Sequence, residues 1–464
     1  MNAPPVTWSN RLKLFWLGIG IPVCLLWGAA LVIRLTPPYK HLHDFVQEWT
    51  SARNHFIGQP VYLSLNESIP LHFGKSYKVL LDVNAHPPAS VLVSLPLGKL
   101  DYATAYLAWN LLSLLMLAVS LWLLLRPRGL NYNLWAALPI TCFLLVGNSL
   151  AQQVNQGQLN LLLLLLLTGC WAAMRSGRSA TAGGLLGMAT AIKLFPGYLF
   201  FYFLARRDWI AIVYGGLAFA FLNGLTGIVL GWDCFRDYAL EVVPQVGAFR
   251  DFWPNASITG FWSKLLDGSS GHVVPLFHAP WLAKLASGVM CLAMTVGYTG
   301  RVWRADTPER RDAAFGLGIV AMLLVSPITW DHYFLLLILP LAICWKEKKQ
   351  GSDPICRETD LRVPSTKGSR TLFIRRSALL SVIVVLCIIN PKWIWDATIP
   401  GDGELVFDPG LTASVAQPVH TLTVVSYQFY ALLAFFVFHY VRRASDAPAT
   451  TETTLTSPRQ AAVT

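Results

Sequence analysis

Polar residues able to do chemistry gather at the ends of apolar stretches in this sequence, and Asp44 is the first of them. Glu48 follows one helical turn later, so a helix that begins here places both carboxylates on one face. An aspartate just above an apolar stretch is suited to act as a general base. A helix cap or a solvated loop acid would account for the same spacing.

A second polar group is the amide-rich run Asn155-Gln156-Gly157-Gln158-Leu159-Asn160, which adjoins a leucine-rich stretch. Side-chain amides are costly in an apolar setting unless partners satisfy their hydrogen bonds. Gln158 and Asn160 are therefore candidates to hold the hydroxyl groups of a sugar. Bonding within the helix turn itself is the alternative.

Lys193 is a single cation inside the otherwise apolar residues 181–204. A cation held near the outer leaflet is what a lipid-linked phosphate requires, so Lys193 is a candidate phosphate ligand. The alternative is a lysine that extends its ammonium to the membrane interface.

The segment Ser326-Pro327-Ile328-Thr329-Trp330-Asp331-His332-Tyr333 places an acid, an imidazole and two aromatic rings in one tight turn. This combination suits sugar stacking, hydrogen bonding and proton transfer. An aromatic belt at a membrane interface would explain Trp330 and Tyr333, but it would explain neither Asp331 nor His332.

Other familiar motifs add little. The triplets at Asn66 and Asn255 match the N-glycosylation pattern, which also occurs by chance. No phosphate-binding glycine loop, Cys-x-x-Cys pair or metal-ligand spacing is present, so we expect neither a metal, nor a cofactor, nor cytosolic nucleotide chemistry.

The composition indicates a membrane protein. Hydrophobic residues make up 54% of the 464 and charged residues only 13%, and the mean hydropathy is +0.49. A soluble protein with a net charge of +11 would suggest a nucleic-acid partner. Here Lys and Arg punctuate apolar stretches as the positive-inside rule requires, so we expect membrane lipid and no nucleic acid as partners.

We therefore predict an all-α, polytopic transmembrane protein that crosses the bilayer about twelve times, with both termini in the cytoplasm. Residues 1–443 form one membrane domain, and residues 444–464 form a disordered cytoplasmic tail. The longest external loops cover about 36–86, 231–280 and 390–420, and a basic cytoplasmic loop covers about 346–376. Because both flanks of 181–204 are basic, we expect two short helices hinged at residues 193–196.

Under this topology the histidines lie almost entirely outside, whereas the cytoplasmic loops hold charge and little else. The external loops are therefore expected to form the active face.

Several short patterns follow one another in a recognisable order. They are Asp44-Phe45 with Trp49, Ala52, Gly58, Pro60 and Tyr62; His86-Pro87-Pro88; Gly157-Gln158-Leu159-Asn160; Gly184 to Gly187 with Lys193-Leu194-Phe195-Pro196; and Ser326-Pro327 with Trp330-Asp331-His332. In this order they resemble glycosyltransferase family 87, membrane enzymes of the GT-C class related to polyprenol-phosphate-mannose-dependent mannosyltransferases. The chain departs from the pattern at His86, where Tyr is usual, and at Tyr333, where a second His is common.

The resemblance implies a hexosyltransferase that takes a hexose, expected to be mannose, from a polyprenyl phosphate to a glycolipid or glycan acceptor at the outer face of the cell membrane. It implies Asp44 as the base, Lys193 and His332 as phosphate ligands, and an inverting reaction. Glu48, His86, Gln158, Asn160, Trp330 and Asp331 are the expected sugar or acceptor contacts.

Two other functions fit parts of the sequence. A transporter or flippase of lipid-linked glycans would also place polar groups near broken helices, although no inverted repeat is evident. An oligosaccharide ligase would use outer loops and lipid carriers too, with external arginines, of which the loops offer Arg53, Arg236 and Arg250.

Overall fold

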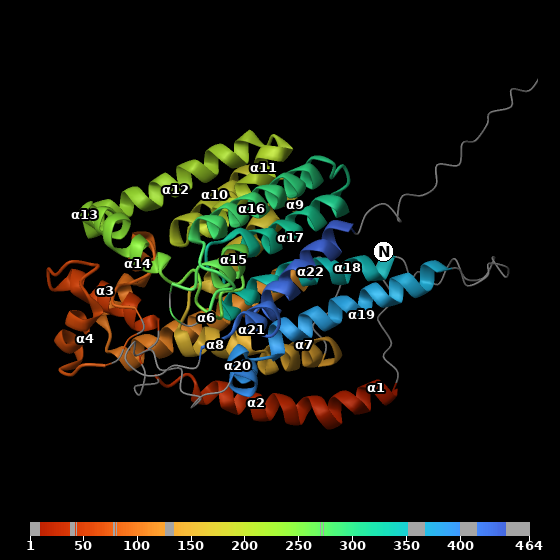
Figure 1. The fold of residues 1–464 in the computed structure, drawn as a ribbon, viewed down its shortest axis with the longest axis horizontal. Helices are drawn as coiled ribbons and strands as arrows, with labels where there is room; N and C mark the ends of the chain where they lie inside the picture. The colour runs from red at the N-terminus through yellow and green to blue at the C-terminus, as the bar shows by residue number, and fades with distance from the viewer. Residues whose placement is uncertain are drawn as a thin grey trace, which may run out of the picture.

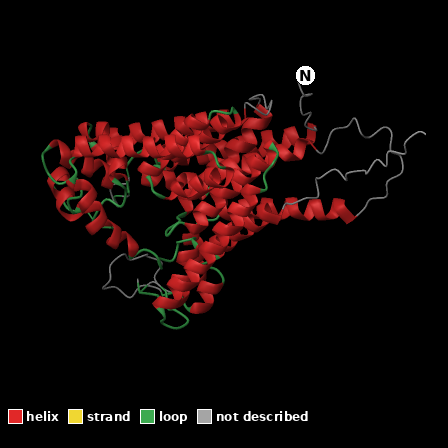
Figure 2. Cartoon of the chain, turned by 90° about the horizontal axis from the view of Figure 1, so that it is seen from above, coloured by secondary structure: helices red, strands yellow, loops and turns green. Residues whose placement is uncertain are grey.

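The structure is a computed structural model, and it describes residues 10–37, 42, 44–77, 79, 81–125, 134–269, 271, 273–350, 367–399 and 415–441. These residues form helices and connecting loops (Figure 2), apart from one isolated bridge between Val273 and Ala416. The predicted all-α class is therefore confirmed for the described chain. The predicted tail 444–464 and most of the loop 346–376 lie outside the described residues.

Five helices are long and apolar enough to cross a membrane. They are Lys13–Ile33, which contains α2 (Ile21–Ile33), α6 (Tyr102–Leu125), α12 (Trp209–Leu230), α16 (Pro280–Trp303) and Pro418–Val441, which contains α21 (Pro418–Leu422) and α22 (Tyr427–Val441). Two bent helix pairs raise the count to seven. The chain is therefore a multi-pass helical membrane protein with five to seven candidate spans, and the predicted twelve crossings depend on shorter helices as well.

Two of those shorter apolar helices, α9 (Asn160–Arg175) and α10 (Ser179–Ile192), pack against each other, and α10 also packs against α12, which lies along the outer edge of the bundle (Figure 1). Glycines bring α10 and α12 into close contact. A Cβ added at Gly183 would lie 1.9 Å from the carbonyl oxygen of Ala211, and one at Gly187 would lie 2.1 Å from that of Gly215. Small residues at these positions allow the two backbones to touch, as is usual between membrane helices.

The predicted hinge after α10 is confirmed. Lys193 leaves the helix in an extended conformation, with φ −140° and ψ 134°. The 3₁₀ helix η4 (Phe195–Leu199) and α11 (Phe200–Arg206) follow. Pro196 removes a backbone donor at the start of η4, which favours a break at this point.

The first residues of the amide-rich run are helical. Asn155 and Gln156 end the helix α8 (Asn148–Gln156), which is bent by 63° from the end of α7 (Leu134–Val146). Gly147 is extended and interrupts the helix, and Gly157 ends α8 in the left-handed conformation. The amide-rich run therefore lies at the end of α8, a helix that faces the interior of the protein.

Four of the helices predicted to be external gather at one end of the helix bundle. Figure 1 shows α3 (Phe45–Phe56), α4 (Leu65–Phe73), α13 (Asp233–Asp237) and α14 (Val243–Gly247) at the left end of the molecule. The short helix α5 (Pro88–Ser94) packs against α3 and does not span, as its length predicts.

The remaining helices complete the bundle. They are α1 (Asn10–Phe15), α15 (Ile258–Leu266), α17 (Pro308–Val325), η6 (Asp331–Leu337), α18 (Ile338–Gln350), α19 (Lys367–Ile388) and α20 (Pro391–Thr398). Arg175 at the end of α9 pairs with Asp312 of α17 at 2.7 Å and fastens those two helices together.

Candidate active site

Asp44 occupies the position just before α3, but its side chain makes no capping bond to that helix. Its Oδ2 instead accepts a hydrogen bond from the side-chain amide of Gln158, and Oδ1 lies 3.5 Å from Nε2 of Gln47. The carboxylate is partly exposed. A capping role therefore does not explain Asp44, and the predicted helix face beginning at this residue is present.

Gln158 connects Asp44 to Lys193. While its amide nitrogen donates to Asp44, its Oε1 accepts from Nζ of Lys193 at 2.8 Å. The Oδ1 of Asn160 lies 3.5 Å from the same ammonium, and Asn160 is itself held by Gln153, whose Oε1 accepts from Nδ2 of Asn160 at 3.1 Å. The carboxylate, the amide and the ammonium thus form one continuous hydrogen-bonded array.

Lys193 is a buried cation at the centre of the site. Its exposed fraction is 3%, and its Nζ lies 4.7 Å from the centre of the Tyr333 ring. The negative charges of Asp44 and Glu48 both favour the protonated form of its amine. Because the ammonium is held inside the protein, Lys193 does not extend to a membrane interface.

Asp331 and His332 approach the array from η6. Oδ2 of Asp331 accepts from the side-chain amide of Asn148, and its Oδ1 accepts from the backbone nitrogen of His332 at 2.8 Å. His332 is 2% exposed; its Nδ1 lies 3.4 Å from Oδ1 of Asp331, and its Nε2 has no hydrogen-bond partner within the described part of the chain. The ring centre of His332 lies 4.9 Å from that of Tyr333, whose ring centre lies 4.7 Å from Nζ of Lys193, so the imidazole and the array are neighbours. A buried imidazole with an unbonded Nε2 is ready to bind a polar ligand there.

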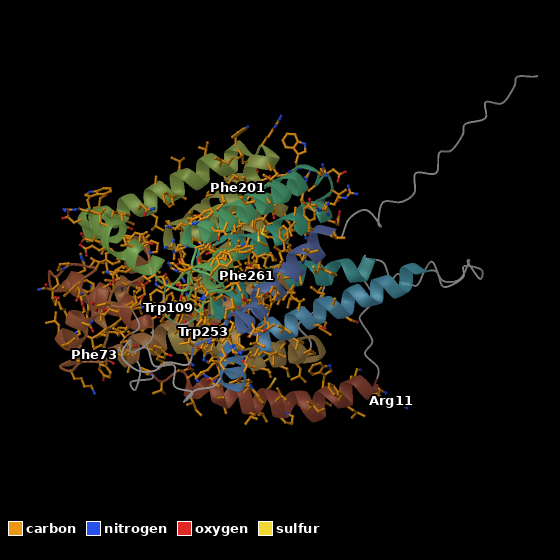
Figure 3. All side chains as sticks on the ribbon, viewed as in Figure 1. Arg11, Phe73, Trp109, Phe201, Trp253 and Phe261 are labelled. Atoms are coloured by element: carbon orange, nitrogen blue, oxygen red, sulfur yellow. The ribbon has the colours of Figure 1, made fainter. Side chains whose placement is uncertain are left out.

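Gly157 makes the contact between Asp44 and Gln158 possible. Its φ is +60°, and a Cβ at this position would lie 2.6 Å from Cβ of Phe45, the residue that follows Asp44. The carbonyl of Gly157 accepts from Nε1 of Trp109, labelled in Figure 3, at 2.7 Å. Only glycine meets both requirements without strain.

Replacing Gly157 with alanine is therefore expected to separate Asp44 from Gln158. We expect the Gly157→Ala protein to lose transfer activity by roughly tenfold or more, since a shift of about 1 Å at a reacting group has large effects. Thermal unfolding should show a loss of about 1–3 kcal/mol, the usual cost of backbone strain. The same change at Gly231, where the Cβ would meet nothing within 4 Å but φ is +89°, controls for strain alone; equal losses of activity would contradict this role of Gly157.

Glu48 and His86 form a second buried pair beside the array. Nδ1 of His86 lies 2.6 Å from Oε1 of Glu48, and the hydroxyls of Ser90 and Ser94 also reach the carboxylate, at 3.1 Å and 3.4 Å. Glu48 is 2% exposed. With its oxygens engaged, Glu48 is placed to orient His86 and to leave Nε2 of that ring for another partner.

Trp330 belongs to a cluster of aromatic rings over the site. Its ring packs edge-on against Phe252 at 5.5 Å, and the neighbouring Trp253, labelled in Figure 3, packs against Trp395 of α20 at 4.8 Å. The predicted external loops 231–280 and 390–420 therefore meet through their aromatic side chains.

Lys264 binds the backbone of the segment that carries Trp253. It is fully buried, and its Nζ donates to the backbone carbonyls of Trp253 and Asn255, both at 3.0 Å. Burial lowers the pKa of Lys264 to about 7, and the charge of Asp251 offsets part of that effect.

The lowered pKa of Lys264 predicts a dependence of stability on pH. Between about pH 7 and the ordinary lysine pKa, the unfolded chain binds a proton that the folded chain lacks, so stability should rise with pH by up to about 1.4 kcal/mol per unit. Thermal unfolding of wild type and Lys264→Met from pH 7 to pH 9 checks this difference. A parallel pH profile in the two proteins would refute it.

Sequence reasoning missed three residues of this site. Asn148 and Gln153 lie within α8 and hold Asp331 and Asn160, respectively. Asn255 was recognised only as a weak glycosylation triplet. Their amide side chains next to apolar stretches were the available signal. Across the described ranges, no group of three or more His, Cys, Asp or Glu residues could hold a metal ion.

The fold and this site together define a helical membrane protein whose buried polar array lies near the end formed by α3. Residues 84–327, more than half of the chain, match the family model of glycosyltransferase family 87, and the chain belongs to that family. Gln158 and Lys193 lie inside the matched range, whereas Asp44 and His332 lie outside it.

Three relatives support the same grouping. A polyprenol-phosphate-mannose-dependent alpha-(1-2)-phosphatidylinositol mannoside mannosyltransferase of Mycolicibacterium smegmatis is 27% identical over 56% of this chain and 60% of its own length. The protein of that description from Mycobacterium tuberculosis is 28% identical over 68% of this chain and 75% of its own. An alpha-(1->3)-arabinofuranosyltransferase of Corynebacterium glutamicum is 25% identical over 47% of this chain and 49% of its own. No solved structure matches the chain.

Proposed function

We propose that this protein is a hexosyltransferase that moves mannose from a polyprenyl phosphate to a glycolipid or glycan acceptor, with inversion at the anomeric carbon. The observation that carries the proposal is the hydrogen-bonded array Asp44–Gln158–Lys193, which holds a partly exposed carboxylate and a buried cation on either side of one amide. The named donors of the mannosyltransferase relatives supply the donor class.

Asp44 acts as the general base in this proposal. It accepts the proton of an acceptor hydroxyl, and the resulting oxygen attacks the anomeric carbon of the donor. The bond from that carbon to the phosphate oxygen breaks as the new bond forms, and polyprenyl phosphate leaves with the bonding electrons. A β-linked donor would therefore give an α-mannoside.

Lys193 and His332 stabilise the departing phosphate. A buried ammonium offsets developing negative charge more strongly than an exposed one, because little solvent screens it. His332, whose Nε2 has no partner within the described part of the chain while Nδ1 lies 3.4 Å from Asp331, is available to donate to a phosphate oxygen or to orient the acceptor. Asn160 supports Lys193, and Asp331 holds the backbone beside the imidazole.

The acceptor is expected to contact His86 and Trp330. Glu48 orients His86 and does not itself contact sugar in this arrangement, because its carboxylate is already bonded. Trp330 offers a ring face for stacking, as sugar sites commonly do. Phosphatidylinositol mannosides, the acceptors named for the relatives, are the first glycolipids to test.

We place the reaction at the outer face of the cell membrane, with both termini in the cytoplasm. Support comes from the gathering of α3, α4, α13 and α14 at the end of the bundle where Asp44 lies, whereas basic residues such as Arg175 end the helices at the other side. On this basis the external loops close over the site.

Transfer by purified protein tests the proposed function. Radiolabelled polyprenyl-phosphate-mannose, polyprenyl-phosphate-arabinose and nucleotide-linked mannose are each supplied with phosphatidylinositol mannosides. We expect labelled product from the first donor and none from the nucleotide sugar. Transfer from the arabinose donor alone would mean that the transferred sugar is arabinose and not mannose. Uptake of lipid-linked glycan into vesicles with no bond formed would replace the proposal with transport.

A further inference from the structure

Asn255 is a buried amide whose hydrogen-bonding capacity is fully used. Its Nδ2 donates to the carbonyls of Arg250 at 2.9 Å and of Pro327 at 3.0 Å. Its Oδ1 accepts from the backbone nitrogens of Ser257 at 3.1 Å and of Thr329 at 2.9 Å. The exposed fraction of Asn255 is zero. Both atoms of one amide thus bind two chain segments at once.

Two further bonds join the same segments. The backbone nitrogen of Ala256 donates to the carbonyl of Thr329 at 2.9 Å, and the hydroxyl of Ser257 donates to the carbonyl of Pro327 at 3.0 Å. Residues 255–257 therefore fix the backbone of residues 327–329 from one side. Lys264 fixes residues 253–255 in turn through its bond to the carbonyl of Asn255.

The turn formed by residues 327–329 leads directly into Trp330, Asp331 and His332. Thr329 is fully buried, and its hydroxyl donates back to the carbonyl of Leu323 at 2.6 Å, so the turn is held at both ends. The nearest polar group to the ring of His332 is the adjacent Asp331, whose Oδ1 lies 3.4 Å from Nδ1, and Nε2 has no hydrogen-bond partner within the described part of the chain. Because Asp331 belongs to the same turn, the direction of the ring depends on the backbone before it, which Asn255 holds.

We propose that Asn255 is a positioning residue for the reaction, because it sets the turn that aims His332 and Trp330 at the Lys193 array. This inference rests on the proposed function of that array. It also assigns a structural use to the triplet at 255–257 and excludes a glycan there, since a buried Nδ2 that donates two bonds is not available for modification.

The Asn255→Asp substitution tests the proposal with almost no change of shape. It replaces the two donated bonds by repulsion between a carboxylate and the carbonyls of Arg250 and Pro327. The matched control is Asn66→Asp, the same change at the other triplet, where the side chain is exposed. Full-length purified proteins are compared by kcat and by the KM values for polyprenyl-phosphate-mannose and for acceptor.

We expect Asn255→Asp to raise the KM for the donor by roughly tenfold and to lower kcat, with Asn66→Asp unchanged. A purely structural role would lower the amount of active protein and leave both KM values unmoved, which would overturn the proposal. Wild type without any transfer would instead overturn the proposed function.

Gly260→Ala provides an independent perturbation of the same amide. A Cβ on Gly260 would lie 2.5 Å from Cγ of Asn255, so it displaces the amide without changing its chemistry. The donor KM should rise as it does in Asn255→Asp. If either protein fails to fold, Ser257→Ala removes the bond to Pro327 together with the cap bond from the backbone nitrogen of Gly260, and it leaves the Asn255 amide in place. It should shift the donor KM in the same direction by a smaller factor, and an unchanged donor KM there would contradict the proposal.

Discussion

The Asp44→Asn substitution is expected to abolish mannosyl transfer in a protein that remains folded. The Asp44→Asn change keeps the shape of the side chain and removes the ability to take a proton, so the rate should fall by about 10³-fold, within the range usual for a lost general base. Nε2 of Gln158 can still donate to the amide oxygen of an asparagine at this position, and the bond from Lys193 to Oε1 of Gln158 is kept, which should preserve the local fold. The measurement is the initial rate of label transfer at saturating donor and acceptor.

Glu67→Gln is the matched control for the loss of a carboxylate. Glu67 lies in the same external segment, at the start of α4, and is exposed. We expect its rate to equal that of wild type. A similar fall in both variants would mean that charge in this segment matters in general, and full activity in Asp44→Asn would remove Asp44 from the chemistry.

The second large effect is expected at Lys193. Lys193→Met fills a similar volume but removes the buried cation from the array, so the leaving phosphate loses its compensating charge. We expect kcat to fall by roughly 10²-fold or more, the loss typical of one electrostatic group aimed at the developing charge. Lys193→Arg keeps the charge but replaces a compact ammonium by a larger planar group, and it should recover only part of the rate.

Lys284→Met controls for the substitution itself, because Lys284 is exposed near the start of α16. Its rate should match that of wild type. The thermal stability of Lys193→Met also discriminates between roles. A large loss of stability with unchanged kcat per folded molecule would show that Lys193 only satisfies Gln158 and the nearby carboxylates.

Much of the fold follows from the sequence because apolar length and basic flanks are local signals. The apolar stretches 103–125 and 209–230, each long enough to cross a bilayer, correspond to α6 (Tyr102–Leu125) and α12 (Trp209–Leu230). The hinge at Lys193 followed from the basic residues on both flanks of residues 181–204, because two ends on the same side of the membrane require an even number of crossings. Short helices such as α9 and α10 carry weaker signals, which is why the predicted twelve crossings exceed the five to seven candidate spans.

The candidate site was only partly predictable. Residue types and order identified Asp44, Gln158, Lys193 and His332, but pairing between distant segments is not encoded locally. The sequence gives no sign that Gln158 bridges Asp44 to Lys193, or that Glu48 is occupied by His86. The sequence did not identify Asn255 as part of the site, because the N-glycosylation triplet already explained this residue. Only its burial in the structure reveals that its side chain joins two chain segments.

Stoichiometric product analysis tests the central claim most directly. Wild type and Asp44→Asn are incubated with polyprenyl-phosphate-mannose and phosphatidylinositol mannoside, and mass spectrometry quantifies the released polyprenyl phosphate and the mannosylated lipid. The proposed reaction predicts equal amounts of the two products from wild type, a new linkage cleaved by α-mannosidase, and neither product from Asp44→Asn. Equal product from both proteins, or polyprenyl phosphate released without mannosylated lipid, would contradict it.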